Sequence, residues 1–338
     1  MKAYFHPSQD LHAPKTYFTK GQMRQPQEVA DRTGQMLEGL KELGVEVLQP
    51  ADQGAAPISD IHDLGYLRFL ESAHQRWMEQ DDWGEEVISN IFVRSPNHLQ
   101  GILAEAARYQ ADGSSPIGPK TWEAAYWSAQ STLGAADAIK AGDRVSYAVC
   151  RPPGHHARRD AAGGFCYLNN AAIAAQYLQD RFARVAILDT DMHHGQGIQE
   201  IFYDRSDMLY VSIHGDPTNF YPVVTGFENE RGEGDGEGYN INYPMPHGSS
   251  EAYFFETLDK ALRDIKLYDP DVLVLCLGFD IYKNDPQAKV SVTSEGFAKL
   301  GKHLSRLHLP TLVVQEGGYD LETLSENVQQ FFTGIGGV

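Results

Sequence analysis

Two side chains that could bind a metal ion follow a strongly apolar stretch in the middle of the chain. Residues 184–188 are nearly all apolar, which is typical of a strand buried on both faces of a parallel sheet. If the backbone stays extended, Asp191 and His193 point the same way, with Asp189 behind them, because side chains two positions apart share a face. A carboxylate and an imidazole are two of the three protein ligands of an open zinc site. An isolated Asp-x-His is more often an ordinary loop, so the other motifs decide its meaning.

Four more apolar segments end in residues that can carry chemistry. Ligands of open α/β sheets bind outside the carboxyl ends of the strands, so these ends should meet in one crevice. The segments are 145–150, 208–213, 271–277 and 311–314, and they are followed in turn by His155 and His156, by His214, by Asp280 and by Tyr319.

Together these residue types predict a metal site that activates water. Zinc with open positions acts as a Lewis acid and lowers the pKa of its bound water toward neutrality. Histidines beside it can transfer protons, and a phenol can donate a hydrogen bond to a developing oxyanion. We expect Asp191, His193 and Asp280 to bind the metal, His155 and His156 to act as base and acid, Tyr319 to be the donor, and Asp189 to orient one histidine.

The composition indicates a globular protein that works without nucleic acid. The 338 residues are 42% hydrophobic and 22% charged, which suffices for a large core. The net charge of -18, from 46 acidic and 28 basic residues, argues for a cationic ligand or high solubility. The three cysteines lie far apart in apolar segments, which is typical of reduced thiols in the cytoplasm. The longest apolar run, 272–279, is too short to cross a membrane.

Strands and helices alternate along the last two-thirds of the chain, which predicts a mostly parallel sheet with helices on both faces. Apolar residues at helical spacing over 29–43 and an Ala-rich stretch over 121–141 predict two of the helices. Residues at about 79–120 show little periodicity, so we expect a loop insertion at the mouth of the site or between subunits. The whole chain, 1–338, is expected to form one α/β domain.

Five sequence blocks resemble, in order, the signature motifs of the histone deacetylase superfamily. The likeness spans most of the chain. Within the superfamily, the single-domain length, the long segment before Thr121 and the block 215–217 look most like the bacterial acetylpolyamine amidohydrolases. The five blocks are Arg151-Pro152-Pro153-Gly154-His155-His156, Gly163-Gly164-Phe165-Cys166-Tyr167-Leu168-Asn169-Asn170, Asp189-Thr190-Asp191-Met192-His193-His194-Gly195, Leu277-Gly278-Phe279-Asp280 and Glu316-Gly317-Gly318-Tyr319.

The resemblance implies the arginase/deacetylase α/β fold, one catalytic zinc ion, and hydrolysis of an acetamide to acetate and a free amine. It implies small acetylated polyamines, such as acetylputrescine or acetylcadaverine, as substrates. It also implies that His156 transfers the proton, that His155 is its electrostatic partner and that Tyr319 polarises the amide carbonyl. By the same likeness, Phe165 and Tyr221 would be the aromatic walls of the substrate channel with the Gly164 carbonyl beside them, and Asp189, Asp191, His193, Ser212 and Ile213 would surround a structural potassium ion.

Two positions depart from the pattern of these relatives. Gln196 stands where some of them carry an Asp or Asn partner for the second histidine, so His156 lacks a charged partner there. The N-terminal loop offers Tyr17 and Phe18 where an acid would be expected to hold a polyamine ammonium group.

The insertion at about 79–120 offers candidate acids in its place, Glu105 and Asp112, although a solvated loop acid is the commoner case. In the polyamine enzymes this segment is associated with a dimer that narrows the entrance to the site. We therefore expect a homodimer that admits slim, flexible substrates.

Three other functions remain open at this stage. A protein lysine deacetylase would use the same chemistry on a bulkier substrate. A binuclear manganese ureohydrolase would share the fold, but residues 281–284 separate Asp280 from the next acid, Asp285. A catalytically silent binding protein would have lost a metal ligand or Tyr319, and the chain has lost neither.

Overall fold

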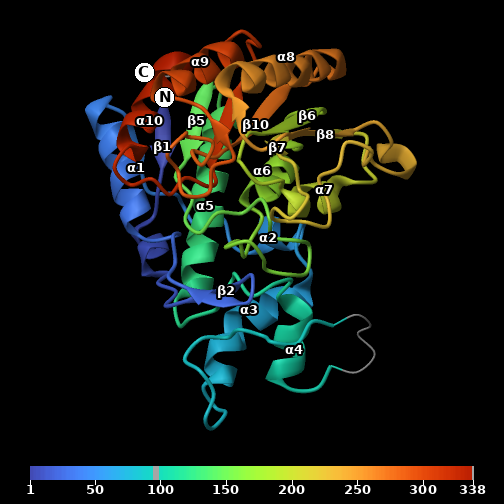
Figure 1. The fold of residues 1–338 in the computed structure, drawn as a ribbon. Helices are drawn as coiled ribbons and strands as arrows, with labels where there is room; N and C mark the ends of the chain where they lie inside the picture. The colour runs from blue at the N-terminus through green and yellow to red at the C-terminus, as the bar shows by residue number, and fades with distance from the viewer. Residues whose placement is uncertain (94–98, 337–338) are drawn as a thin grey trace.

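An eight-stranded sheet forms the centre of the molecule (Figure 1), and every neighbouring pair of its strands is parallel. The computed structural model describes residues 1–93 and 99–336. The prediction of an α/β fold with a mostly parallel sheet is confirmed. In spatial order the strands are β4 (Glu46–Leu48), β1 (Lys2–Tyr4), β5 (Val145–Ala148), β12 (Thr311–Gln315), β10 (Val272–Leu277), β6 (Val185–Asp189), β7 (Met208–Gly215) and β8 (Asn240–Met245).

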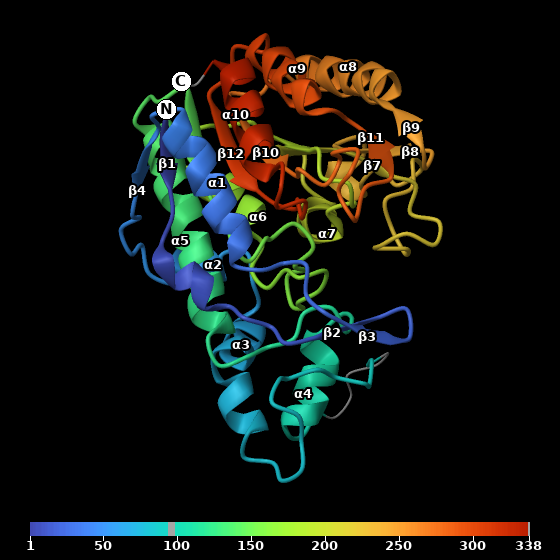
Figure 2. The ribbon, with the colours of Figure 1, turned by 60° about the vertical axis from the view of Figure 1, so that its left-hand side comes forward.

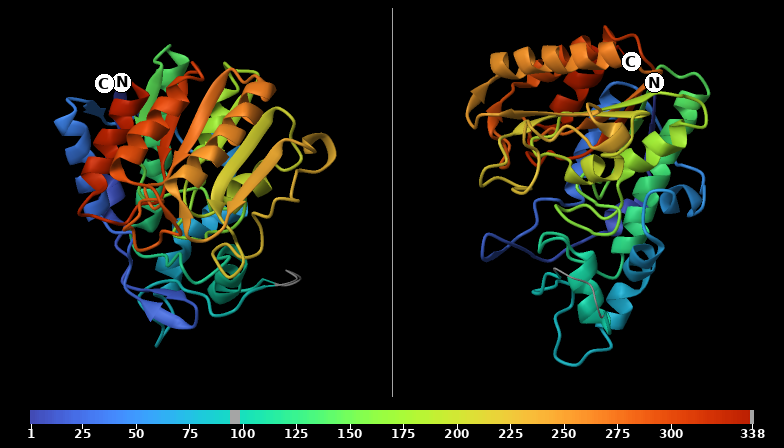
Figure 3. Two further views of the ribbon diagram at one scale, coloured as in Figure 1. Left: turned by 45° about the horizontal axis from the view of Figure 1, so that its top comes forward. Right: turned by 90° about the vertical axis from the view of Figure 1, so that its right-hand side faces the viewer.

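Two layers of helices cover the sheet, one on each face, as the edge-on view in Figure 3 shows. Successive residues of the strands enter opposite layers: Ile187 packs in one core cluster and Leu188 in the other. This alternation explains why the central strands are apolar throughout. One layer contains α1 (Asp31–Glu42), α8 (Glu251–Tyr268), α9 (Ser294–Ser305) and α10 (Leu324–Ile335), and the other contains α5 (Thr121–Lys140), α6 (Asn170–Leu178) and α7 (Gln196–Phe202). The helix α3 (Leu64–Trp77) lies beyond the sheet, where it packs against α4 (Ile102–Tyr109) and α5 (Figure 2).

Four of the helices, α3, α6, α8 and α9, begin after a residue whose side chain accepts a hydrogen bond from their free backbone amides. The Ser250 side chain accepts from the amide of Tyr253 at the start of α8. The small residues of α5 allow close packing: a Cβ atom on Gly134 would lie 2.9 Å from Cδ1 of Tyr4 in β1. Among the helices of the described residues, none combines the length and apolar character that crossing a bilayer requires.

A hairpin and the insertion extend beyond the sheet on the side where the strands end (Figures 1 and 2). Residues 17–24, expected as part of a loop, form the two-stranded hairpin of β2 (Tyr17–Thr19) and β3 (Gln22–Arg24). The amide of Phe18 donates to the carbonyl of Gly113 at 2.8 Å, so the hairpin is attached to the insertion. The insertion contains a short helix, α4 (Ile102–Tyr109), where no helix was predicted.

The remaining elements are short. They are α2 (Ala56–Ser59), the 3-10 turns Pro7–Leu11 and Gly234–Gly236, and the two-stranded ribbon of β9 (Ser249–Ser250) with β11 (Val290–Ser291).

Candidate metal centre and substrate cavity

Four adjacent strands of the sheet, β5, β12, β10 and β6, deliver the chemistry-bearing residues to one place. All four are parallel, so their carboxyl ends lie at the same edge. His155 and His156 follow β5, Tyr319 follows β12 and Asp280 follows β10. The sequence prediction that distant strand ends converge is confirmed for these four strands, whereas His214 of β7 is fully buried beside His194 and is not part of the metal-ligating group.

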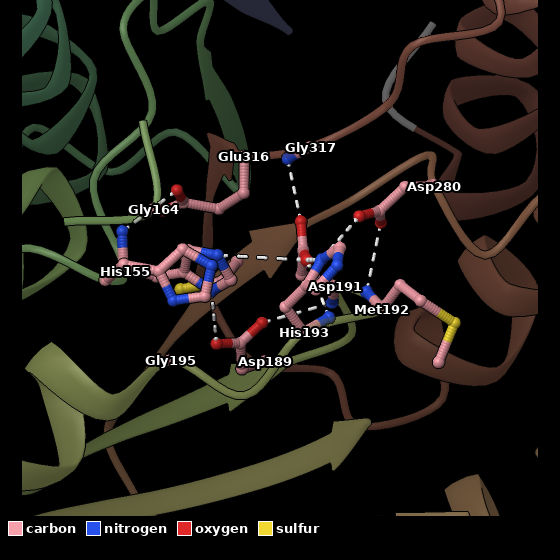
Figure 4. A network of polar contacts seen from close by, with 12 residues as sticks. His155, Gly164, Asp189, Asp191, Met192, His193, Gly195, Asp280, Glu316 and Gly317 are labelled. Atoms are coloured by element: carbon pink, nitrogen blue, oxygen red, sulfur yellow. Dashed lines mark hydrogen bonds and ion pairs between the residues drawn. The ribbon is translucent and has the colours of Figure 1, made fainter. Parts of the chain in front are cut away.

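Asp191, His193 and Asp280 form the one group among the described residues in which at least three acidic, His or Cys side chains could share a metal ion. Nδ1 of His193 lies 3.2 Å from Oδ1 of Asp191 and 3.1 Å from Oδ2 of Asp280 (Figure 4). Ligands of a tetrahedral zinc ion at about 2.0–2.2 Å stand roughly 3.4 Å apart. The spacing of these three atoms therefore fits a single zinc ion.

Backbone amides fix the carboxylate oxygens that turn away from this centre. The amide of Gly317 donates to Oδ2 of Asp191 at 2.7 Å, and the amide of Met192 donates to Oδ1 of Asp280 at 3.0 Å. Each carboxylate thus keeps one oxygen for the shared centre. Orientation of ligands by such outer hydrogen bonds is typical of built metal sites.

The charges at this centre call for a cation. Asp191 and Asp280 are 1% and 0% exposed, so neither carboxylate is stabilised by bulk water. Burial, followed by repulsion from Asp191, raises the pKa of Asp280 to about 7. A divalent cation would remove this repulsion and keep both groups ionised.

His155 is held by a buried carboxylate behind it. Its Nδ1 atom lies 3.0 Å from Oδ2 of Asp189, which also accepts a hydrogen bond from the Tyr210 hydroxyl at 3.0 Å. Burial disfavours the charged imidazole, but Asp189, Asp191 and Glu316 outweigh it and raise the pKa of His155 to about 10. These carboxylates therefore favour the charged form of His155.

His156 has the opposite electrostatic surroundings. Its Nδ1 atom lies 2.6 Å from Oε1 of Gln196, the neutral residue at the first position of α7. Burial, followed by the charges of His155 and His193, holds the pKa of His156 well below its usual range. His156 is therefore neutral at physiological pH, which is the state in which an imidazole accepts a proton.

Tyr319 is positioned through its own backbone. Its amide donates to Oδ2 of Asp285 at 2.6 Å, while the Arg32 side chain donates to the carbonyl oxygens of Gly318 and Glu316, at 2.6 Å in each case. The Arg32 guanidinium also lies 4.9 Å from the centre of the Tyr319 ring. Burial raises the pKa of Tyr319 well above its usual value, so the hydroxyl stays protonated and can donate.

A cavity of about 610 Å³ opens onto this centre. A second hollow, of about 670 Å³, lies elsewhere, beside Lys2 and Thr311 at the starts of their strands, away from the metal-ligating group. The cavity of about 610 Å³ is therefore the candidate substrate cavity, because it is the one that opens onto the metal-ligating group. Its lining includes His156, His193, Tyr319, Gly164, Phe165, Tyr221, Phe220 and Tyr17 together with Lys20, Met23 and Arg24 of the hairpin.

The wall of the cavity beside His156 admits no side chain at Gly164. This residue has a φ of +56°, and a Cβ atom on it would lie 2.3 Å from Cδ2 of His156 and 2.8 Å from Cε1 of Tyr221. Phe165, whose ring centre lies 6.1 Å from that of Tyr319, forms the adjacent wall. The predicted channel residues thus meet at the cavity.

Several predicted residues lie outside the cavity lining. Glu105 forms a two-pronged ion pair with Arg76 at 2.6 and 2.7 Å, so its carboxylate is already paired in α4. Ser212 and Ile213 are fully buried in β7, where Ser212 pairs with Asp189 of β6. His98, for which the sequence suggested no ligand role, lies outside the described residues.

Three supporting residues, Asp285, Arg32 and Glu316, had no role predicted for them, and a fourth, Asp112, was predicted to hold an ammonium group but instead supports Tyr221. Asp285 and Arg32 fix the segment that carries Tyr319, and Glu316 accepts from the amides of Gly154 and His155 at 2.7 and 3.0 Å. Asp112 accepts a hydrogen bond from the Tyr221 hydroxyl at 2.6 Å. Glu316 stands inside a recognisable motif, so its position was a usable signal, whereas the other three are distant in sequence from the groups they hold.

The chain is similar to known proteins over its full length. A sequence profile described as histone deacetylase domain matches residues 26–335. Acetylpolyamine amidohydrolase of Burkholderia pseudomallei is 62% identical over 99% of both chains, and acetylpolyamine amidohydrolase 1 of Pseudomonas aeruginosa is 42% identical over 97% of this chain and 96% of the relative. A crystal structure of acetylpolyamine aminohydrolase from Burkholderia pseudomallei superimposes with a TM-score of 0.99 at 62% identity, covering 99% of this chain and 98% of that one. Profile, sequence and structure agree that this chain belongs to the histone deacetylase family.

Proposed function

We propose that this protein is a zinc-dependent amidohydrolase that removes acetyl groups from acetylated polyamines or related small N-acetylated amines. The products are acetate and the free amine. The observation that carries the proposal is the convergence of Asp191, His193 and Asp280 at the end of a cavity, with His156 and Tyr319 in the same lining. The names of the two most similar relatives described above support acetylated polyamines as the substrate class.

The metal ligands, His156 and Tyr319 would each have a separate role in the reaction. Asp191, His193 and Asp280 would hold the zinc ion, which when bound polarises the amide carbonyl and acidifies a water molecule. Neutral His156 would take the proton from this water and then give it to the leaving amine. The Tyr319 hydroxyl would donate to the carbonyl oxygen as negative charge develops on it.

His155 and Asp189 would set the electrostatic potential of the site and would not themselves transfer the proton. The ion pair between them is fully buried, so its field reaches the reacting atoms with little screening. A positive His155 keeps its neighbour His156 neutral before the reaction. This arrangement favours His156 as the base and His155 as its electrostatic partner.

A structural potassium ion is also proposed, near Asp189, Asp191, His193, Ser212 and Ile213. The register of β6 and β7 places Asp189 beside Ser212, which supports a common site for their oxygen atoms. The Ser212 hydroxyl already contacts Nδ1 of His214 at 2.7 Å, so it would offer the ion a lone pair. The ion would hold the loop that carries Asp191 and His193.

The shape of the cavity favours a slim substrate. The rings of Phe165 and Tyr17 pack edge to face at 5.1 Å, and Tyr221 packs edge to face against His156 at 4.8 Å. Between such aromatic walls a methylene chain can be buried, whereas a folded protein surface cannot follow it to the metal. An acetylated polyamine offers such a methylene chain, and so does acetyl-lysine, so the assay below compares the two.

The cationic end of a polyamine requires an acid that a single chain does not offer in the described lining. Charged side chains at the cavity are Lys20 and Arg24, and no described carboxylate borders it apart from the buried metal site. We propose that a second copy of the chain supplies the acid through the insertion at about 79–120. Exposed apolar side chains on the hairpin and insertion, Phe18, Met23, Ile91 and Phe92, support a homodimer formed there.

We further propose that residues 1–338 work as one domain with this insertion, and that the enzyme is cytoplasmic. The three cysteines are unpaired and buried, as expected for a chain in a reducing compartment.

The function is tested by measuring acetate release by zinc-loaded enzyme from acetylputrescine, acetylcadaverine, acetylspermidines and an acetyl-lysine peptide. We expect kcat/KM to be highest for the small amines. Faster turnover of the peptide would support a protein lysine deacetylase instead. Two bound manganese ions per chain by metal analysis would support a ureohydrolase.

A further inference from the structure

A chain of hydrogen bonds connects His156 to a carboxylate in the insertion. Oε1 of Gln196 lies 2.6 Å from Nδ1 of His156, and Nε2 of Gln196 donates to the Tyr221 hydroxyl at 3.0 Å. The Tyr221 hydroxyl in turn donates to Oδ2 of Asp112 at 2.6 Å. The three links join the insertion, the loop after β7 and the start of α7, which are far apart in the sequence.

Asp112, at the end of the series, determines which group donates in each of these hydrogen bonds. A carboxylate can only accept hydrogen bonds, so the single Tyr221 proton goes to Asp112. The phenol oxygen is then left as an acceptor for Nε2 of Gln196, which turns Oε1 toward His156. Because Oε1 only accepts, Nδ1 of His156 must carry the proton, and Nε2 of the neutral ring is left without one.

We propose that Asp112, acting through Tyr221 and Gln196, selects the His156 tautomer whose Nε2 atom is free to accept a proton. This inference rests on the proposed hydrolytic function, in which His156 is the base. Asp112 is thus a positioning residue that does not touch the substrate. A neutral Gln196 alone could not fix the tautomer, because its amide can present either oxygen or nitrogen to the ring.

The reversed arrangement is excluded by its contacts. With the Gln196 amide turned round, its nitrogen would face Nδ1 of His156 and its oxygen would face the phenol oxygen of Tyr221. Two buried oxygen atoms would then meet without a proton between them, because the Tyr221 proton is used by Asp112. Nε2 of His156 would carry the proton and could not act as a base.

Asp112, the last residue of this series of hydrogen bonds, is itself held in place by backbone amides. Oδ1 of Asp112 accepts from the amide of Ser114 at 2.8 Å, and Oδ2 accepts weakly from the amide of Gly164 at 3.3 Å. Burial, followed by the negative charge of Asp112, raises the pKa of Tyr221 well above its usual value, so the phenol remains a donor. The Tyr221 hydroxyl therefore stays a donor to Asp112.

The first readout is the tautomer itself, measured by ¹⁵N NMR on histidine-labelled, zinc-loaded enzyme. The His156 signals are assigned by their loss in His156→Ala. We expect the wild-type ring to be protonated at Nδ1, and Tyr221→Phe to redistribute the proton between the two nitrogens. A wild-type ring protonated at Nε2 would overturn the inference, and so would an unchanged tautomer in Tyr221→Phe.

The second readout is kinetic coupling. Tyr221→Phe should lower kcat about tenfold with KM changed less than about threefold. Gln196→Glu supplies an acceptor that needs no help from Tyr221, so in that background the same change should alter kcat less than about threefold. An equal loss in both backgrounds would mean that Tyr221 acts only as a wall.

Tyr177→Phe is the matched control, because it removes a phenol hydroxyl that donates to Asp137 at 2.8 Å away from the site. It should change neither readout. The NMR readout also separates this inference from the proposed function. A wild-type enzyme with the Nδ1 proton in place but without acetate release would contradict the function and leave the tautomer selection standing.

Discussion

Nδ1 of His193 lies 3.1 Å from Oδ2 of Asp280, although 87 residues separate the two in sequence. The contact joins the loop after β6 to the loop after β10, which are adjacent strands. It is short enough for both atoms to bind one ion and is flanked by a second buried carboxylate, Asp191.

Replacing Asp280 by Asn should abolish stable zinc binding. The variant loses a charged ligand but keeps the size of the side chain. We expect less than about 0.1 zinc per chain after gel filtration, against about one for the wild type, by metal analysis. Asp259→Asn, on the outer face of α8, is the control and should retain its zinc.

The same variant makes a prediction about the metal-free protein. Without a cation, Asp191 and Asp280 repel each other, and Asn at position 280 removes that repulsion. With a chelator present, Asp280→Asn should therefore melt at a higher temperature than the wild type, whereas added zinc should reverse the order. A wild type that stays the more stable of the two in chelator would contradict the account.

Removing the imidazole of His156 should stop turnover without releasing the metal. His156→Ala is expected to lower kcat by roughly 10²–10⁴-fold while zinc content remains about one per chain. Steady-state kinetics and metal analysis on the same preparation measure both. A variant with kcat within about twofold of wild type would remove His156 from the mechanism.

The Tyr319 hydroxyl is expected to act only as charge develops on the carbonyl oxygen. Tyr319→Phe should therefore lower kcat by roughly 10²–10³-fold, with a much smaller change in KM. If KM rose while kcat stayed unchanged, the hydroxyl would serve binding and not catalysis.

Asp285 gives a prediction about pH. Burial raises the pKa of this carboxyl group to about 6, despite the amides that donate to it. Its proton is thus held more tightly in the folded chain than in the unfolded chain, where the pKa is about 3.9. As the pH rises from about 4 to about 6, the unfolded state releases this proton first, so the folded state loses stability relative to it.

Asp285→Asn lacks this titration and serves as the reference. The free energy of unfolding of the wild type minus that of the variant should fall between pH 5 and 6 and level off by about pH 7. Urea denaturation in chelator at several pH values gives the difference. A difference that does not change between pH 5 and 6 would contradict the assignment.

The proposed homodimer is tested by sedimentation equilibrium of the zinc-loaded enzyme. We expect a dimer, and we expect Phe92→Glu in the insertion to shift it toward monomer because a charge would enter the apolar contact. Leu267 is 83% exposed on α8, on the other side of the molecule, so Leu267→Glu is the matched control. A wild type that is monomeric at all concentrations would refute the dimer.

The sequence was sufficient to predict the central strands of the sheet and the residues at its carboxyl edge, but not the edge strand β8. Strands such as β6 and β10 are continuous apolar runs, and the residues that follow each of them stand in recognisable motifs. Parallel pairing then brings those motifs together without further information. The local motifs and the parallel topology together were therefore enough to predict that Asp191 and Asp280 lie close together.

The sequence was insufficient where long-range contacts decide the structure. The strands β2 and β3 have three residues each, and α4 has eight, so none shows a clear periodicity. The hydrogen bond from Tyr221 to Asp112 spans 109 residues and depends on how the insertion folds back. Neither position alone carries a signal for that contact.

The most direct test of the central claim is a zinc titration of chelated, metal-free enzyme with acetate release from acetylputrescine as the readout. Activity should rise linearly with added zinc and level off at one zinc per chain, and Asp280→Asn should show no such rise. Full activity in the metal-free enzyme, or saturation only at two metals per chain, would contradict the single-ion site of Asp191, His193 and Asp280.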